Sequence, residues 1–141
     1  SRARAVSVSR ARTGADDGAS CHRLFTTGIV GLPCAHPVGY GNDGLGYNCV
    51  PIENALVADL NTVGVLAMAR RGGDDSSMGS QFFIVYQDST IPSDAVGGYT
   101  VFGSITSGLD GVKAIADAGT IDGSSDASPL DEVLISSVSV E

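Results

Sequence analysis

The fold of this chain is decided by the stretch Gly79-Ser80-Gln81-Phe82-Phe83-Ile84, which continues into Val85 and Tyr86. Aromatic and β-branched residues favour strands, so the sequence predicts a strand over 82–86 that is entered from a glycine-rich loop. Successive side chains of a strand point to opposite faces, so Gln81 and Phe83 share one face, away from Phe82. That face can offer an amide and an aromatic ring to an extended peptide. Taken alone, the stretch could equally be a core strand with an incidental polar residue.

The composition indicates a single domain of short strands. A chain of 141 residues is long enough to bury its own core, and we expect one domain over 1–141. It holds 19 glycines and 5 prolines, and no long apolar segment has a helical period. Many turns between short strands are typical of this combination, so the predicted class is mainly β.

The chain is acidic, with 16 Asp and Glu residues against 8 Lys and Arg residues. Four arginines lie in the first twelve residues, which leaves little basic surface elsewhere, so nucleic acid and membranes are not expected partners. No stretch approaches the roughly 18 apolar residues that cross a bilayer. We expect a soluble protein, with the cytoplasm favoured and an extracytoplasmic location left open. Cys21, Cys34 and Cys49 leave at least one thiol unpaired in a monomer, so the redox compartment also stays open.

Other elements can be placed from periodicity and turn residues. Strands are expected within 21–38, on either side of a turn, over 62–69 and over 133–140. A helix is expected over 107–118, with one apolar face formed by Leu109, Val112, Ile115 and Ala116. Ser107 and Asp110 form a capping pair at its start, and Gly119 supplies its stop.

Four blocks of sequence together resemble one family. They are residues 79–84, Tyr99-Thr100-Val101-Phe102-Gly103, Cys21-His22-Arg23-Leu24 and Pro51-Ile52-Glu53-Asn54-Ala55. These blocks are similar to the signature of the cyclophilins, the barrel-shaped peptidyl-prolyl cis-trans isomerases. The chain looks closest to the actinobacterial type, and the resemblance runs from about Ala11 to the C-terminus.

The resemblance implies a closed antiparallel barrel of about eight strands with a helix at each open end. Measured against that fold, N-terminal strands are missing from this sequence. Residues 1–20 would then be a degenerate remnant of the first helix and the loop after it. We therefore expect a mainly β, cyclophilin-like barrel with one or two capping helices.

The resemblance also implies the chemistry. Rotation of an X–Pro amide costs about 18–20 kcal/mol because resonance gives the C–N bond partial double-bond character. A catalyst needs no nucleophile, metal or cofactor, but it must hold the proline ring and stabilise the twisted amide. A fixed arginine can donate a hydrogen bond to the amide nitrogen, and Arg23 matches the family's catalytic arginine. Without the surrounding motif, Arg23 would read as an ordinary surface arginine.

The same resemblance implies a substrate-binding set. Its members are Met68, Ala69, Arg70, Gln81, Phe83, Ile91 and Tyr99. Phe83 would be the aromatic wall, Ala69 the small residue under the peptide, and Gln81 the amide partner. Ile91 would supply the loop side of the pocket. Tyr99 replaces a histidine that many members carry, and Arg70 replaces an asparagine that often contacts the peptide backbone.

The segment after Arg23 departs from the family. An aromatic residue, a glutamine and Gly-Asp are usual there, whereas this chain reads Val30, Pro33, Ala35 and His36. Loss of the ring shrinks the pocket, and loss of the glutamine removes a group that orients the arginine. Two functions are therefore carried forward. One is an isomerase that acts on proline-containing peptides and proteins during folding, and the other is a module that binds them without turnover. Cyclosporin-like cyclic peptides stay open as ligands.

Three other patterns are weaker. Residues 39–44 match G-x-G-x-x-G, but Gly46 and Pro51 follow where a dinucleotide-binding helix should begin. Cysteines and histidines near 21–22 and 34–36 suggest zinc, yet the adjacent side chains at 21 and 22 point in opposite directions, so four ligands do not converge. A serine hydrolase is disfavoured because the chain has no G-x-S-x-G turn.

Overall fold

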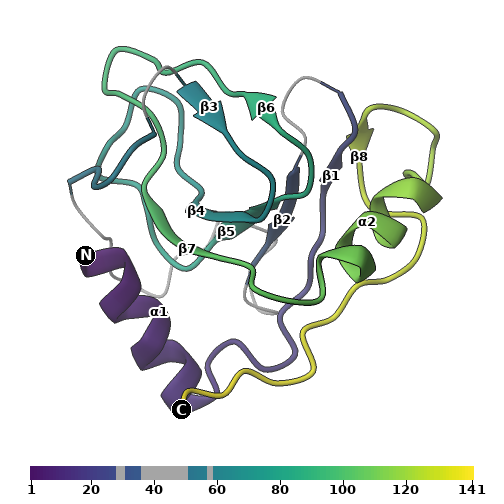
Figure 1. The fold of residues 1–141 in the computed structure, drawn as a ribbon, viewed down its shortest axis with the longest axis horizontal. Coiled ribbons are helices and arrows are strands. Elements are labelled where there is room, and N and C mark those ends of the chain that lie inside the picture. The colour runs from purple at the N-terminus through teal and green to yellow at the C-terminus, as the bar shows by residue number, and fades with distance from the viewer. Residues whose placement is uncertain (28–30, 36–50, 57–58) are drawn as a thin grey trace.

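The computed structural model describes residues 1–27, 31–35, 51–56 and 59–141 (Figure 1). In chain order its elements are α1 (Arg2–Thr13), β1 (Leu24–Phe25), β2 (Gly31–Cys34), β3 (Leu60–Asn61), β4 (Val65–Met68), β5 (Phe82–Val85), β6 (Ser89–Thr90), β7 (Val101–Ser104), α2 (Leu109–Ala118) and β8 (Asp126–Ala127). Six strands form an antiparallel sheet in the order β7-β4-β5-β2-β1-β8, and β3 pairs with β6 separately. The predicted mainly β, antiparallel class with helices is confirmed. Among the described strands, no pairing joins β7 to β8 into a ring.

The strand predicted over 82–86 is at the centre of the sheet. It is β5, and it pairs with β2 on one side and β4 on the other. Phe83 and Val85 are buried in one apolar cluster. Phe82 and Ile84 pack against another cluster. The alternation predicted from the sequence is therefore confirmed, and the two strand faces meet different parts of the molecule.

Both helices pack on the face that carries Phe82. Ala116 of α2 lies in a buried cluster that Phe82 packs against. Ala3 of α1 is buried with Met68 in a neighbouring cluster, which Phe82 also contacts. Among the described residues, the cluster around Phe83 contains no side chain from either helix. The Phe83 face is therefore the one on which a ligand site can be built.

The predicted helix over 107–118 is α2, but its start differs. The helix spans Leu109–Ala118, and Gly119, the stop that the sequence predicts, is its C-cap. The expected capping pair of Ser107 and Asp110 is wrong, because Gly108 occupies the N-cap and no side chain bonds there. Gly108 has a φ of 84°, a conformation that glycine adopts at little cost. The helix therefore starts from a glycine turn rather than from a capping side chain.

The predicted strand over 62–69 is shorter in the structure. Its paired part is β4, which begins only at Val65. The N–H of Val65 bonds to the carbonyl of Thr62 at 3.2 Å, and Gly64 lies at φ 87°. These features form a turn, so the first three residues of the predicted strand lead into the sheet instead of belonging to it.

The strand predicted over 133–140 is wrong. The structure assigns no strand to these residues. Instead, the N–H of Ile135 bonds to the carbonyl of Ala19 at 2.8 Å, and the N–H of Cys21 bonds to the carbonyl of Val133 at 2.9 Å. These separate contacts hold the C-terminal segment along the chain between α1 and β1 without a continuous ladder.

Small and polar residues build α1. The hydroxyl of Ser1 accepts a hydrogen bond from the N–H of Arg4 at 3.3 Å, and Gly14 ends the helix at φ 66°. On the inner side, Arg10 is buried, and its Nε donates to Asp16 at 2.9 Å. A cavity of about 160 Å³ lies between α1 and the sheet. Its lining includes Val6, Ser7, Met68, Phe82, Phe102 and Val138.

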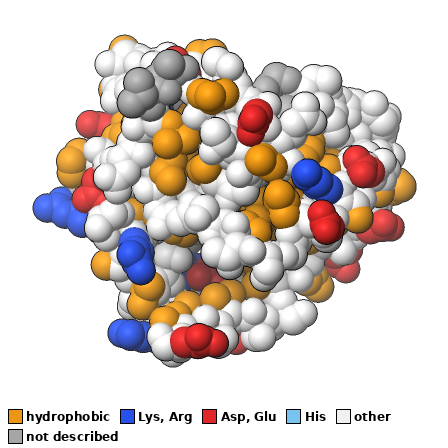
Figure 2. Space-filling model, viewed as in Figure 1, with side chains coloured by type: hydrophobic (Ala, Val, Ile, Leu, Met, Phe, Trp, Pro, Cys, Tyr) orange, Lys and Arg blue, Asp and Glu red, His pale blue; other side chains and the backbone are white. Residues whose placement is uncertain are grey.

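Charged side chains are unevenly distributed on the face shown in Figure 2. Basic side chains lie mainly on the left, toward α1, and acidic ones mainly on the right, toward α2 and β8. This agrees with the sequence, in which four of the arginines fall in the first twelve residues. On this face, the region toward α2 and β8 therefore carries mostly acidic side chains.

Candidate functional site

A row of opposed residues crosses the central strands on the Phe83 face. The registers place Phe83 of β5 opposite Pro33 of β2 and opposite Ala67 of β4. Ala67 in turn opposes Val101 of β7. Directly opposed residues carry their side chains on the same face of a sheet. This row is therefore the floor of the candidate site.

Arg23 extends the row beyond β2. The next residue, Leu24, is fully buried in the cluster on the Phe82 side, so Arg23 points to the opposite face. Phe25 opposes Gly31, the first residue of β2, and if that register is continued past the start of β1, Arg23 falls beside Pro33, although the two form no ladder pair. Arg23 thus lies on the same face as Phe83, with one strand, β2, between them. At the usual strand spacing, their backbones are about 10 Å apart.

One edge of the Arg23 guanidinium is bonded to Asp126. Nε donates to Oδ1 at 2.6 Å, and Nη2 donates to Oδ2 at 2.7 Å. The guanidinium carbon lies 4.4 Å from the centroid of the Phe25 ring, and the side chain is 49% exposed. These hydrogen bonds lower the pKa of Asp126 and raise the pKa of Arg23, so both groups stay charged near neutral pH. Within the described residues, the Nη1 amino group makes no hydrogen bond and remains available to a ligand.

A stack of three side chains stands at the other end of the row. The ring of Tyr99 meets Phe83 edge-on, with centroids 5.4 Å apart and an interplanar angle of 90°. The guanidinium carbon of Arg70 lies 4.8 Å from the Tyr99 centroid. The Arg70 side chain is only 1% exposed, so it serves as a fixed backing for the tyrosine.

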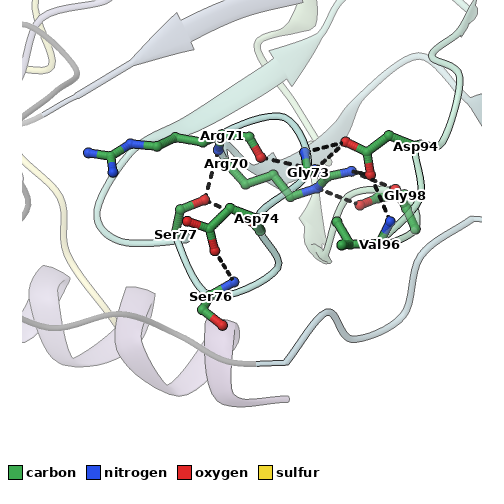
Figure 3. Close-up of polar contacts among 10 residues, drawn as sticks. Arg70, Arg71, Gly73, Asp74, Ser76, Ser77, Asp94, Val96 and Gly98 are labelled. Atoms are coloured by element: carbon green, nitrogen blue, oxygen red, sulfur yellow. Dashed lines mark hydrogen bonds and ion pairs between the residues drawn. The ribbon is translucent and has the colours of Figure 1, made fainter.

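Asp94 holds Arg70 in that position (Figure 3). Nη1 and Nη2 of Arg70 donate to the two carboxylate oxygens at 2.8 and 3.0 Å, and Nε donates to the carbonyl of Gly98 at 3.0 Å. The N–H groups of Gly73 and Val96 donate to the same carboxylate at 2.8 and 3.1 Å. The Arg70 hydrogen bonds, with the one from Gly73, hold the pKa of Asp94 well below its usual range. The loop that leads to Tyr99 is therefore tied to the end of β4.

The remaining predicted residues lie beside this stack. The N–H of Ala69 bonds to the carbonyl of Gln81 at 2.9 Å, which fixes the ends of β4 and β5 side by side. The Gln81 side chain is half-buried and makes no hydrogen bond within the described part of the chain. Ile91 is buried in the same cluster as Phe83. The candidate site consists of Arg23, Ala69, Arg70, Gln81, Phe83, Ile91 and Tyr99.

Met68 is not brought to the candidate site, which corrects the expectation that it encloses a proline. Successive residues of β4 alternate, so Ala67 faces Phe83 and Met68 faces the other way. Met68 is buried against Ala3 and Met78, in the cluster beneath α1. Its role is in the core.

Pro33 lies in a strand with neighbours on both sides, where proline is uncommon because it lacks an N–H. Ala35, two residues later, exchanges both of its backbone hydrogen bonds with Ser20 on the β1 side. Alternate residues turn their backbone groups to the same neighbour, so the Pro33 nitrogen also faces that side. Among the described residues, 21–23 make no ladder pair with β2 there. The missing donor falls in this gap, and a disulfide between Cys21 and Cys34 spans it.

Two aspartates that hold arginines of the candidate site, Asp126 and Asp94, were not predicted from the sequence. Asp126 is separated from Arg23 by 103 residues, and Asp94 from Arg70 by 24. The acidic loop over 122–131 is visible in the sequence, but nothing in its composition says which acid meets an arginine. Only the pairing of β8 with β1 brings Asp126 into range.

Some sequence predictions fall outside the described residues. Val30, His36, Cys49 and the G-x-G-x-x-G match over 39–44 are in this group. Of the suggested zinc ligands, Cys21 and Cys34 are bonded to each other. In the part of the chain that the structure describes, neither helix has the length and apolar character needed to cross a membrane.

Comparison with known proteins assigns the family. Residues 8–140 match the model of the cyclophilin type peptidyl-prolyl cis-trans isomerase/CLD family. The chain belongs to the cyclophilin family. The resemblance inferred from the sequence motifs is thereby confirmed, and the actinobacterial likeness is confirmed by relatives.

A probable peptidyl-prolyl cis-trans isomerase B of Mycobacterium tuberculosis is 41% identical over 143 residues, which cover 93% of this chain and 44% of that protein. The peptidyl-prolyl cis-trans isomerase B of Bacillus subtilis is 34% identical over 108 residues, which cover 76% of this chain and 69% of that protein. This cyclophilin chain thus spans less than half the length of the mycobacterial relative.

Solved cyclophilin structures share the fold. A Cryptosporidium parvum cyclophilin type peptidyl-prolyl cis-trans isomerase, in the presence of the dipeptide Ala-Pro, has a TM-score of 0.76 and 24% identity to this chain. The match covers 99% of this chain and 84% of that one. A second structure of the same Cryptosporidium protein has a TM-score of 0.70 and 25% identity, and covers 92% and 76% of the two chains. At this identity the likeness establishes the cyclophilin fold.

Proposed function

We propose that this chain catalyses the cis–trans isomerisation of X–Pro bonds in proline-containing peptides and proteins. One observation carries the proposal. The guanidinium of Arg23 has an available amino group, Nη1, and it shares a sheet face with the aromatic pair of Phe83 and Tyr99. One strand, β2, separates the arginine from Phe83. A proline ring on the aromatic pair would direct its amide nitrogen toward the arginine.

The chemistry requires hydrogen bonding and shape alone. As the X–Pro bond twists, the nitrogen loses conjugation and regains a lone pair, which can then accept a hydrogen bond from an N–H of Arg23. The planar amide offers no such lone pair, so the interaction is stronger in the transition state than in either ground state. Gln81 would hold the peptide backbone through its amide.

The aromatic pair sets how the proline ring is held. Phe83 is only 6% exposed, because Tyr99 and the cluster around it cover the ring. An incoming proline therefore packs on Tyr99 first, so the ring of Tyr99, held by Arg70, forms the outer wall against which the proline ring is placed. The position of Tyr99 consequently governs the affinity of the candidate site for proline.

A binding module without turnover is the second candidate function. It is favoured by Pro33, which lies between Arg23 and Phe83 and offers no side-chain hydrogen bond to the arginine. Such a module would bind X–Pro peptides and leave their exchange rate unchanged. Cyclic peptides of the cyclosporin kind would compete for the candidate site under either function.

The disulfide bears on the compartment. Disulfides persist in oxidising environments and are uncommon in the cytosol. The Cys21–Cys34 bond therefore supports the extracytoplasmic alternative over the cytoplasmic location that the sequence alone favours. Free-thiol labelling of the protein isolated from its own cells tests this, since labelling of both cysteines would contradict it.

Replacement of Arg23 tests the proposed function. NMR exchange spectroscopy on a short X–Pro peptide measures the isomerisation rate and the affinity separately. We expect Arg23→Ala to lower the catalysed rate about 100-fold with the fold intact, since one transition-state donor is lost. Arg23→Lys should restore little, because a single ammonium does not reproduce the oriented fork. Arg12→Ala, on the exposed side of α1, is the matched control. Unchanged exchange in folded Arg23→Ala would contradict the assignment, and peptide binding without exchange by the wild type would favour the binding module.

A further inference from the structure

The strand beside Arg23 on the aromatic side gives it no hydrogen-bonding partner. β2 lies between Arg23 and Phe83, and continuing the Phe25–Gly31 register brings Pro33 beside Arg23, without a ladder pair between them. The proline side chain has neither a donor nor an acceptor. An arginine side chain has several rotatable bonds, and fixing it in one orientation costs conformational entropy. A transition-state donor must nevertheless be oriented before the reaction.

The partner comes from the other side of β1. The sheet order places β8 next to β1 and away from β2, and Asp126 of β8 directly opposes Phe25. Arg23 lies two residues before Phe25, and its guanidinium carbon is 4.4 Å from the Phe25 ring centroid, so the two side chains share a face. Asp126 is therefore a diagonal neighbour of Arg23 on the same face, within reach of a long side chain.

The geometry of this pair selects one edge of the guanidinium. The carboxylate accepts from Nε and Nη2, which form the edge toward β8, at 2.6 and 2.7 Å. The planar guanidinium has five N–H donors, and the two on Nη1 project from the end that this contact leaves uncovered. Bidentate pairing fixes the plane as well as the position of the group. The ring of Phe25 supports that plane from one face, 4.4 Å from the guanidinium carbon.

We propose that Asp126 is the positioning residue of Arg23, and that it holds one edge of the guanidinium from β8 so that the opposite end meets the X–Pro amide. Asp126 takes the orienting role that Pro33 cannot fill. This inference rests on the proposed isomerase function. Under this inference, β8 contributes to catalysis by positioning Arg23, although no residue of β8 was predicted from the sequence to belong to the site.

Both side chains of the pair are exposed: 49% of the Arg23 side chain and 46% of the Asp126 side chain are accessible to solvent. Exposed pairs of this kind contribute little to stability, so Asp126 should act mainly on orientation. The expected signature is a slower catalysed rate with unchanged peptide affinity and an unchanged Tm. A carboxylate also offsets part of the positive charge of Arg23. If that charge effect dominated, removal of Asp126 would raise the catalysed rate, whereas the positioning role predicts that removal lowers it.

The test uses NMR exchange spectroscopy on a short X–Pro peptide with the full chain. Asp126→Asn is nearly isosteric and should lower the catalysed rate about tenfold while the peptide Kd and the Tm stay unchanged. Asp126→Glu keeps the carboxylate and should recover most of the rate. Asp131→Asn, which removes an exposed acid of the neighbouring loop, is the control. In an Arg23→Ala background, Asp126→Asn should have no further effect on the rate.

The solvent exchange of the Arg23 Nε proton gives a readout that does not depend on activity. It should be slow in the wild type and fast in Asp126→Asn. An active wild type whose rate is unchanged or raised by Asp126→Asn would overturn this inference alone. An equal loss of rate in the Arg23→Ala background, or a loss that accompanies lower Tm, would also overturn it. A wild type that does not accelerate exchange would overturn the proposed function and this inference together.

Discussion

The guanidinium of Arg70 lies against the ring of Tyr99, with its central carbon 4.8 Å from the ring centroid. Tyr99 in turn meets Phe83 edge-on. A cation over an aromatic face is attracted by the ring quadrupole, and this attraction is larger for a shielded cation. Arg70 is thus joined to the aromatic pair of the candidate site, while its hydrogen bonds run to Asp94 and the loop beyond it.

Removal of Arg70 should loosen this arrangement. We expect Arg70→Ala to weaken X–Pro peptide binding about five- to tenfold, because the loss of the cation–π contact, about 0.5–2 kcal/mol, frees Tyr99. The Tm should fall by several degrees as the loop detaches. Titration with a labelled peptide and thermal unfolding measure the two effects. Arg71→Ala is the control, since the Arg71 side chain points away from the cluster in Figure 3. Equal effects at the two positions would point to net charge as the cause.

Stability should depend on pH through Asp94. Its pKa in the folded protein is depressed by Arg70, so the pair contributes stability above the unfolded pKa of about 3.9 and loses it as pH falls through the lower folded value. The wild type should therefore exceed Asp94→Asn in Tm by a constant margin from pH 7 to about 5, and the margin should shrink below about pH 4. A margin that stays constant down to pH 2 would show that the carboxylate charge is not what matters.

The cavity beneath α1 should accept a larger side chain. Ser7 lines this cavity, and Ser7→Leu should raise stability by about 1 kcal/mol through burial of apolar surface. Ser9→Leu, on the exposed side of the same helix, brings the same gain in helix propensity without the burial. The difference between the two variants in chemical denaturation isolates the cavity contribution. A less stable Ser7→Leu would instead show that the side chain overpacks the space.

Pro33 offers a test of the altered strand. Pro33→Gln supplies an amide beside Arg23 and should raise the catalysed rate, while burial of the amide lowers stability by about 1–3 kcal/mol. Pro33→Ala is the control because it also returns the backbone N–H but adds no amide. Rates for both variants come from the same exchange measurement. An equal gain in the two variants would assign the effect to the backbone rather than to the glutamine.

Features specified by short stretches of sequence were predicted well. The alternation of Phe82 and Phe83 follows from strand geometry, and the end of α2 at Gly119 follows from backbone freedom at one residue. Of the residues predicted for the site, Phe83, Ile91 and Tyr99 are brought together in the structure, and their role in substrate binding stays a prediction.

Features that depend on distant segments could not be predicted. The pair of Arg23 and Asp126 exists only because β8 lies beside β1, and a composition-based reading of the acidic loop contains no such information. Residues 133–140 alternate like a strand, but the chain opposite them offers only separate hydrogen bonds. Met68 was misplaced because carrying over a motif position did not take account of the face of β4 on which it falls.

Pairing of Arg23 and Arg70 with aspartates has a consequence for how clients approach. Each arginine of the candidate site is locally neutralised, so it adds little to the field felt at a distance. That field is governed instead by the formal charge of −8. Under the proposed function, we therefore expect long-range attraction to favour segments in which lysine or arginine flanks the proline, with association rates that fall as salt is added. The candidate site would then discriminate among prolines by shape, while the acidic exterior would favour clients by their charge.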